Sequence, residues 1–181
     1  MVRAIQLQTE RLLLRPYRRS DIKALVPLVG AREVAATTLR IPHPYTEKDA
    51  QALLKQIAKD KTVTRFGIFL RESGDLCGGI GLNLELQHNR GELGYWIGVP
   101  YWGRGIATEA AREIVRYGFE ELGLHRIFAN YYVGNTASQR VLERLGMKYE
   151  GRFVHHVKKW DEYRDLDNYG FTVDVWKAAQ R

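Results

Sequence analysis

A glycine-containing turn between an apolar strand and a periodic helix is the segment of this chain best suited to chemistry. The segment runs from Glu92 to Glu109, and Gly103 and Gly105 lie just before the helix. The first turn of a helix has unpaired backbone N–H groups and a partial positive charge, so it attracts anions. Glycines beside it allow the backbone to approach a phosphate closely. The segment therefore predicts a site for a phosphate-bearing cofactor.

The rest of the pattern predicts the elements that position this turn. Alternating apolar residues after residue 63, separated by short polar turns, predict an antiparallel meander of three strands. The helix after the glycines carries an apolar stripe, and the strand after that helix predicts a parallel strand–helix–strand unit. The expected strands cover residues 7–17, 63–70, 76–86, 92–99, 126–133, 147–159 and 163–176, and the expected helices cover 20–29, 33–38, 106–122 and 136–145, with another that begins at Thr46. This order predicts an α+β fold, with helices on both faces of a mixed, mostly antiparallel sheet.

Composition limits the class of protein. The chain has 181 residues, 45% of them hydrophobic and 27% charged, which predicts a single domain over residues 1–181. No segment has the apolar length of a membrane span or of a signal peptide, so we expect no membrane association and a cytoplasmic location. A single cysteine, Cys77, excludes a disulfide framework within the chain.

The net charge of +7 favours an acidic partner such as nucleic acid, the ribosome or a phosphorylated cofactor. A basic nucleic-acid-binding module is therefore the alternative from a different functional class. The basic residues are spread along the chain, however, and no nucleic-acid-binding motif accompanies them.

Several motifs together resemble one known family. They are Trp102-Gly103-Arg104-Gly105-Ile106-Ala107, Gly94-Tyr95-Trp96-Ile97, Asn135-Thr136-Ala137-Ser138, Leu145-Gly146-Met147 and the opening Thr9-Glu10-Arg11. With the order of elements, they are similar to the GNAT superfamily of acetyl-CoA-dependent N-acetyltransferases, and to its RimJ/RimL branch. Trp102 stands where the core motif more often has glutamine or arginine. The resemblance implies the GNAT (acyl-CoA N-acyltransferase) fold and acetyl-CoA as co-substrate.

The resemblance also implies which residues hold coenzyme A. Backbone N–H groups would bind its pyrophosphate, and a strand that splays from its neighbour at 127–133 would flank its pantetheine arm. N–H groups of that strand could polarise the thioester carbonyl. The pyrophosphate residues are Gly103, Arg104, Gly105, Ile106, Ala107 and Thr108, and the pantetheine residues are Ile97, Gly98 and Val99, with Asn135 and Ser138 as further contacts.

The sequence leaves open which residues transfer protons in the reaction. Many family members protonate the leaving thiolate with a tyrosine four residues after the position of Ser138, where this chain has Leu142. Ser138 is therefore the expected donor, although it also fits an ordinary third position of a helix. Glu92 and His156 are alternative bases for the acceptor amine. No metal is implied, because the histidines and carboxylates lack ligand spacing.

The expected acceptor is the N-terminal amine of a protein, in particular a ribosomal protein. A small amine such as a polyamine, amino acid or antibiotic is the alternative within the same chemistry. The resemblance leaves open a homodimer, association with the ribosome, and a domain that binds the cofactor without catalysis.

Overall fold

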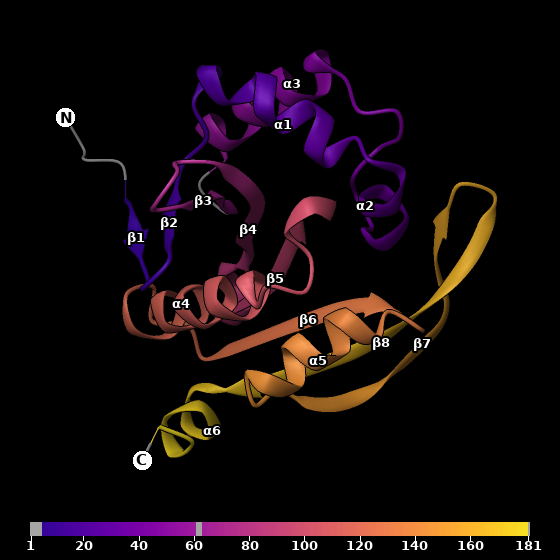
Figure 1. Ribbon diagram of the computed structural model, residues 1–181. Coiled ribbons are helices and arrows are strands. Elements are labelled where there is room, and N and C mark those ends of the chain that lie inside the picture. The colour runs from indigo at the N-terminus through magenta and orange to yellow at the C-terminus, as the bar shows by residue number, and fades with distance from the viewer. Residues whose placement is uncertain (1–4, 61–62, 181) are drawn as a thin grey trace.

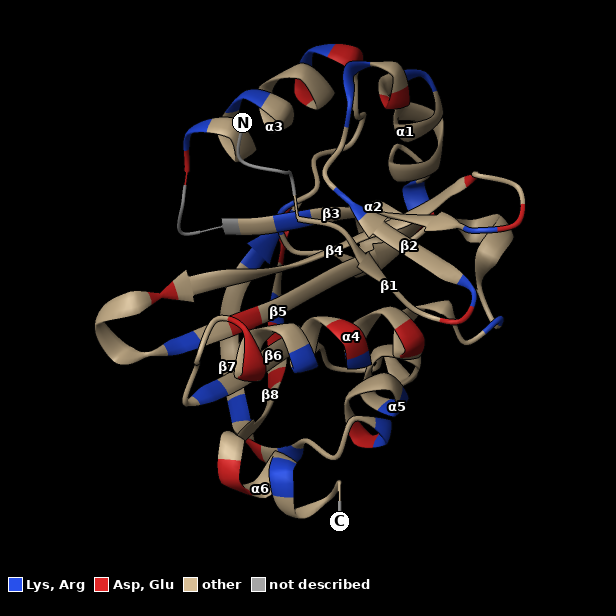
Figure 2. Ribbon diagram, turned by 90° about the vertical axis from the view of Figure 1, so that its left-hand side faces the viewer, with Lys and Arg blue, Asp and Glu red and all other residues tan. Residues whose placement is uncertain are grey.

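A computed structural model describes residues 5–60 and 63–180 and shows one eight-stranded sheet covered by helices on both faces. The strands lie in the order β1-β2-β3-β4-β5-β6-β8-β7. All neighbours pair antiparallel except β5 and β6, which pair parallel. Figure 2 shows α1 and α3 on one side of the sheet and α4, α5 and α6 on the other. The predicted α+β architecture is confirmed.

The strands agree with the expected ranges except near the two ends of the chain. They are β1 (Leu7–Gln8), β2 (Leu12–Arg15), β3 (Val63–Leu70), β4 (Leu76–Glu85), β5 (Arg90–Ile97), β6 (Arg126–Tyr132), β7 (Lys148–Lys159) and β8 (Glu162–Thr172). The predicted strand over 7–17 is wrong, because the chain turns back on itself so that Leu7 pairs with Leu14. The hydroxyl of Thr9 accepts a hydrogen bond from the N–H of Leu12 and closes this turn.

The helices are α1 (Ile22–Val29), α2 (Arg32–Thr37), α3 (Glu47–Lys59), α4 (Ile106–Glu120), α5 (Thr136–Arg144) and α6 (Val173–Ala178). Short 3-10 turns cover Arg19–Asp21, Leu86–His88 and Val99–Tyr101. Thr46 and Asp49 form the expected capping box at the start of α3. The predicted strand over 163–176 is too long. Its partner β6 begins at Arg126, opposite Thr172, so no strand remains to pair with the residues that form α6.

Two apolar clusters hold the helices against the sheet. The larger one packs α4 under the meander and contains Leu12, Ile80, Leu93, Ile114 and Ile127. The smaller one lies on the opposite face, where residues of α1, α2 and α3 contact β3 and β4. Because each face has its own packed layer, the sheet forms a rigid wall between the two sides of the molecule. Within the described ranges, every helix is too short or too polar to cross a bilayer.

Candidate active site

The strands β5 and β6 pair over three residues only. The strands pair from Arg90 opposite Arg126 to Glu92 opposite Phe128, and the register ends there. The rest of β5, from Leu93 to Ile97, is therefore not paired with β6. The predicted splay of these strands is present, and two cavities lie beside it.

The first cavity has a volume of about 440 Å³ and is called here the glycine-loop cavity. It is lined by these predicted cofactor residues: Ile97, Gly103, Arg104, Gly105, Ile106, Ala107, Thr108, Asn135 and Ser138. Gly103 and Gly105 both have φ of +75°, a left-handed conformation that favours glycine. Gly105 is the N-cap of α4, so the N–H groups that follow it are those of an open first helical turn. The loop therefore fits the pyrophosphate group for which the sequence predicts it.

Gly98 and Val99 lie outside both cavities. The N–H of Gly98 donates to the carbonyl of Cys77 at 2.9 Å. This hydrogen bond continues the contact between β4 and β5 and occupies one N–H group that the sequence assigns to the thioester carbonyl. The side chain of Trp102 likewise donates to the carbonyl of Ile97 at 2.7 Å. Among the predicted pantetheine residues, only Ile97 remains beside the glycine-loop cavity.

The carboxylate of Glu109 anchors the glycine loop to the N-terminal turn. It accepts hydrogen bonds from the hydroxyl of Thr9 at 2.5 Å and from Nε of Arg11 at 2.7 Å. Arg11 also donates from Nη1 to the carbonyl of Arg104 inside the loop. Partial burial acts to raise the pKa of Glu109, but these hydrogen bonds outweigh it and hold the pKa below its ordinary value.

Glu109→Gln is expected to cost about 1–3 kcal/mol of stability near pH 7, because it removes charge-assisted hydrogen bonds. The folded pKa is lowered, so this contribution is complete above the ordinary glutamate pKa of about 4.3 and disappears as the pH falls through the folded value. Denaturant unfolding of wild type and variant across this pH range measures the effect. Glu113→Gln is the control, since Glu113 pairs with Arg116 of the same helix. The anchoring role would be contradicted if both variants lost the same free energy of unfolding. It would also be contradicted if the difference in stability between wild type and Glu109→Gln grew as the pH fell.

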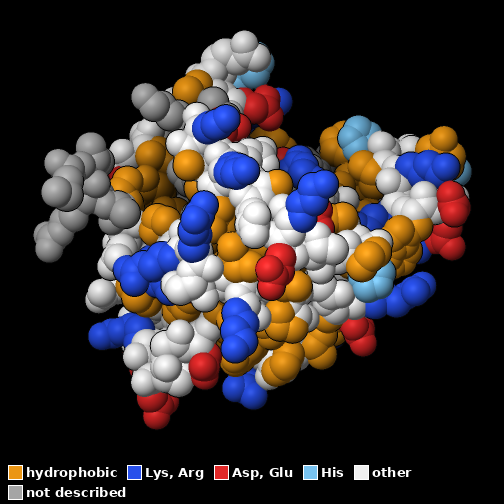
Figure 3. Space-filling view, turned by 90° about the horizontal axis from the view of Figure 1, so that it is seen from above, with side chains coloured by type: hydrophobic (Ala, Val, Ile, Leu, Met, Phe, Trp, Pro, Cys, Tyr) orange, Lys and Arg blue, Asp and Glu red, His pale blue; other side chains and the backbone are white. Residues whose placement is uncertain are grey.

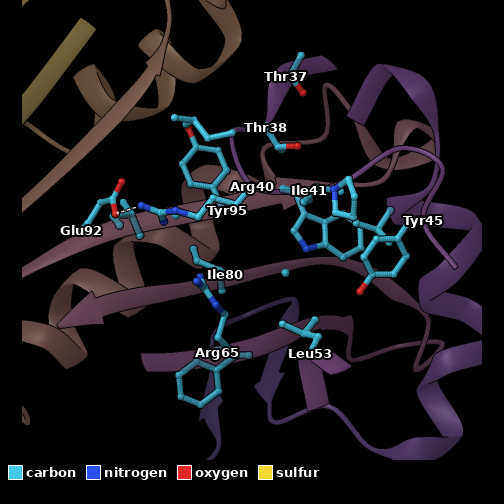
Figure 4. Close-up of a pocket in the computed structure, with 18 of the residues that line it drawn as sticks. Thr37, Thr38, Arg40, Ile41, Tyr45, Leu53, Arg65, Ile80, Glu92 and Tyr95 are labelled. Atoms are coloured by element: carbon cyan, nitrogen blue, oxygen red, sulfur yellow. Dashed lines mark hydrogen bonds and ion pairs between the residues drawn. The ribbon is translucent and has the colours of Figure 1, made fainter. Parts of the chain in front are cut away.

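The second cavity, called here the arginine cavity, lies on the face of the sheet covered by α1, α2 and α3 and has a volume of about 430 Å³. Its lining includes Arg40, Arg65 and Glu92. Oε2 of Glu92 accepts hydrogen bonds from Nη2 of Arg40 at 2.8 Å and from Nδ2 of Asn83 at 3.0 Å. Figure 4 shows this pair, with Arg65 reaching toward it from β3. The sequence-based prediction names Glu92 and Ser138 of this lining, but neither Arg40 nor Arg65.

Tyr95 and Ser138 line both cavities and form part of the wall where they meet. The hydroxyl of Tyr95 donates to the carbonyl oxygen of Ser138 at 3.5 Å. Burial raises the pKa of Tyr95 to about 12, while hydrogen bonding with Ser138 acts in the opposite direction. Asn135 caps α5 by accepting the N–H of Ser138 at 3.1 Å. The expected cap and the expected hydroxyl are thus both present, and Tyr95 adds a phenol that the sequence interpretation did not assign.

The competing base, His156, lies outside both cavities. It is exposed on β7, and its ring packs on Phe153 with centroids 4.9 Å apart. The N–H of the neighbouring His155 donates to Asp165 on the paired strand. The structure therefore brings Glu92 to the arginine cavity and leaves His156 away from it.

The tip of the β7–β8 hairpin reaches the loop after α2. Nζ of Lys159 donates to the carbonyl of Ile41 at 2.6 Å, and Arg32 of α2 stacks on Trp160. The hairpin is visible beside α2 in Figure 1. These contacts connect it to the 38–42 segment that lines the arginine cavity.

The positively charged side chains are spread over the surface rather than gathered in one patch. Figure 3 shows Lys and Arg side chains spread over the face that carries α1, α2 and α3, with hydrophobic and polar side chains between them. On this face the basic residues do not form one continuous tract. A track of phosphate contacts, as for an extended nucleic acid, is therefore less well supported here than a small-molecule site.

Comparison with known proteins agrees with this arrangement. Residues 11–148 match the family model described as acetyltransferase (GNAT) domain. The chain is 31% identical over 173 residues to "Uncharacterized N-acetyltransferase YnaD" of Bacillus subtilis, covering 95% of this chain and 99% of that protein. It is 38% identical over 108 residues, 59% of each chain, to "Putative ribosomal N-acetyltransferase YdaF" of the same species. The crystal structure of an acetyltransferase (GNAT family) from Bacillus anthracis is similar, with a TM-score of 0.84 and 28% identity over 93% of this chain and 98% of that one.

Proposed function

The chain belongs to the GNAT family of acetyltransferases, and from this premise we propose that its acceptor is the N-terminal amine of a protein. The enzyme uses acetyl-CoA as co-substrate. The first candidate acceptor is a ribosomal protein, the kind of substrate that the RimJ/RimL branch implies. The similarity to YdaF supports this candidate. The net charge of +7 would favour approach to the ribosome and, with it, a cytoplasmic location.

The meeting of the two cavities at Tyr95 and Ser138 is the observation that carries this proposal. The glycine-loop cavity would hold coenzyme A through the N–H groups at the start of α4. The arginine cavity would hold the acceptor amine on the other side of the same wall. Both reactants can then be bound at once, which favours direct attack of the amine without an acetylated residue of the enzyme. Tyr95 and Ser138 are placed to donate a proton or a hydrogen bond to the leaving sulfur.

Glu92 is the base candidate that the geometry supports. Arg40 and Asn83 both bind its Oε2, so these hydrogen bonds leave its other oxygen, Oε1, for the acceptor. An N-terminal amine has an ordinary pKa of about 8, so part of it is already neutral near pH 7. Glu92 therefore needs to orient the amine, or to receive its proton through water, rather than act as a strong base.

A small amine is the second candidate acceptor, and the size of the arginine cavity favours it. Its volume of about 430 Å³ lies within the range of small-molecule sites. The contact of Lys159 with Ile41 connects the hairpin to the segment beside this cavity. A peptide acceptor would need to enter past these elements with only its first residues inside.

Calorimetric titration with acetyl-CoA, followed by thiol release in the same samples, tests the proposal. N-terminal peptides of ribosomal proteins and a panel of small amines serve as acceptors. Tight binding with peptide-dependent thiol release would support the first candidate, and release with small amines alone would support the second. Binding without release for any acceptor would point to a non-catalytic domain. Absence of binding, together with salt-sensitive binding to RNA, would favour the nucleic-acid-binding alternative.

A further inference from the structure

The side chain of Arg65 lies on a strip of sheet that contains two glycines. Arg65 on β3 is opposite Gly81 on β4, and Gly81 is opposite Gly94 on β5. Since neither glycine has a side chain, the guanidinium can extend across the strands toward the centre of the sheet. Nη1 of Arg65 lies 3.9 Å from the position that a Cβ at Gly94 would occupy. The register therefore places a positive charge on the floor of the arginine cavity.

The side-chain hydrogen bond of Arg65 goes to an amide rather than to a carboxylate. Nη2 of Arg65 donates to Oδ1 of Asn83 at 2.7 Å, and Asn83 in turn donates to Glu92, the carboxylate that Arg40 also binds. Within residues 5–60 and 63–180, no carboxylate forms a salt bridge with Arg65. Burial lowers the pKa of Arg65 and repulsion from Arg40 adds to this effect, whereas Tyr17, Glu92 and Asp60 act in the opposite direction.

The other carboxylate of the cavity lining is already engaged. Asp49 accepts hydrogen bonds through Oδ2 from the N–H and the hydroxyl of Thr46 at the start of α3. Of the two carboxylates that line this cavity in the described residues, only Glu92 forms a salt bridge with an arginine, and that arginine is Arg40. A partly buried cation without a salt bridge is costly, and an anionic ligand bound directly to it would relieve that cost.

We propose that the acceptor carries a carboxylate near its amine and that Arg65, assisted by Arg40, binds this carboxylate. The proposal rests on the N-acetyltransferase function above and narrows its acceptor. A guanidinium matches a carboxylate with two parallel hydrogen bonds, which fixes orientation as well as charge. The same cations would repel the second ammonium group of a polyamine. The carboxylate can belong to a free amino acid or to an acidic side chain close to a protein N-terminus.

Matched acceptors separate these two sources. One pair consists of alanine and alaninamide, compared at equal concentrations of neutral amine; the other consists of two peptides that differ by Glu or Gln at the second position. We expect the acid of at least one pair to exceed its amide in kcat/KM by about tenfold to a hundredfold, and spermidine to be a poor acceptor. The pair that shows the difference identifies the source. Acids and amides within about twofold of each other in both pairs, or spermidine as the best acceptor, would overturn the proposal.

Substitution of Arg65 tests the residue itself. Arg65→Gln is expected to raise KM for the acid about tenfold or more, with a much smaller change for the amide and unchanged acetyl-CoA affinity. Arg65→Lys should recover part of the preference, because it restores charge without the planar fork. Arg90→Gln is the matched control, since Arg90 pairs with Glu85 on the same sheet and lies outside both cavities.

Equal losses for acid and amide in Arg65→Gln would show a structural role and overturn the proposal. This failure differs from failure of the proposed function itself. If wild-type enzyme releases thiol equally well with acids and amides, acetyl transfer holds and only the acceptor preference falls. If acetyl-CoA binds but no acceptor in either pair leads to thiol release, then neither acetyl transfer nor the carboxylate preference holds for these acceptors.

Discussion

Replacing Gly105 with valine is expected to lower the affinity for acetyl-CoA by about a hundredfold or more, a loss of about 2.7 kcal/mol. Gly105 has φ of +75°, which a β-branched residue adopts only with strain of about 1–2 kcal/mol. Relief of that strain would turn the peptide groups at the start of α4 away from the glycine-loop cavity. If the loop instead kept its shape, the new Cβ would lie 3.6 Å from Nη2 of Arg11, the residue that binds the carbonyl of Arg104 in the loop. Calorimetric titration of acetyl-CoA measures the loss.

Gly123→Val separates this effect from general destabilisation. Gly123 also has a positive φ, +66°, and a Cβ there would meet nothing within 4 Å. It follows α4 and lies outside both cavities, so its substitution should cost stability without changing acetyl-CoA affinity. Equal affinities of wild type and Gly105→Val would remove the phosphate-binding role of the loop. Equal losses of affinity in the two variants would assign the effect to strain in α4.

The contrast between local and long-range signals explains how much of the fold was predictable. The α4 helix and its glycine turn follow from an apolar period and two residues that favour positive φ, both of which are local properties. The turn at Thr9 lies between Leu7 and the apolar run Leu12–Leu14, and nothing in this local pattern separates two short strands from one long strand. The end of β8 depends on where its partner β6 begins, a long-range fact that no local pattern contains.

The same distinction applies to the candidate site. Gly103, Gly105 and Asn135 were predictable because their roles depend on the start of a helix, which the sequence marks directly. Arg65 was not, because its place in the cavity depends on the alignment of Arg65, Gly81 and Gly94 across three strands. A basic residue within an alternating strand is normally solvated, and only the register distinguishes this one.

For His156, the residue type and its place in the fold point in different directions. Its residue type suits a base, but the contacts of β7 place its ring against Phe153 at the surface. In the sequence, Tyr95 belongs only to a strand motif that resembles the family, because the resemblance implies a phenol on the helix, at the position of Leu142. The phenol comes from the facing strand instead.

Removal of the two hydroxyls at the wall between the cavities gives the second large expected effect. Ser138→Ala and Tyr95→Phe should each lower kcat about tenfold to a hundredfold, because loss of a donor to the leaving sulfur acts on the transition state. Acetyl-CoA affinity should change much less, since the proposed pyrophosphate contacts come from the N–H groups at the start of α4. Rapid thiol-release kinetics with saturating acetyl-CoA, beside titrations of the same variants, provide both quantities.

The double variant distinguishes a shared role from separate ones. If Tyr95 and Ser138 act together on one proton, the double variant should be scarcely slower than the worse single variant, because residues acting as a unit are not additive. If each stabilises the leaving sulfur independently, the two single losses should multiply, to about a hundredfold to ten-thousandfold. Adding Leu142→Tyr to the double variant tests whether another hydroxyl can replace the lost ones, because it places a phenol one helical turn beyond Ser138 on the same face. Recovery of turnover would show that the wall requires a hydroxyl donor. Equal losses of turnover and of affinity in both single variants would instead reduce the pair to a structural contact between β5 and α5.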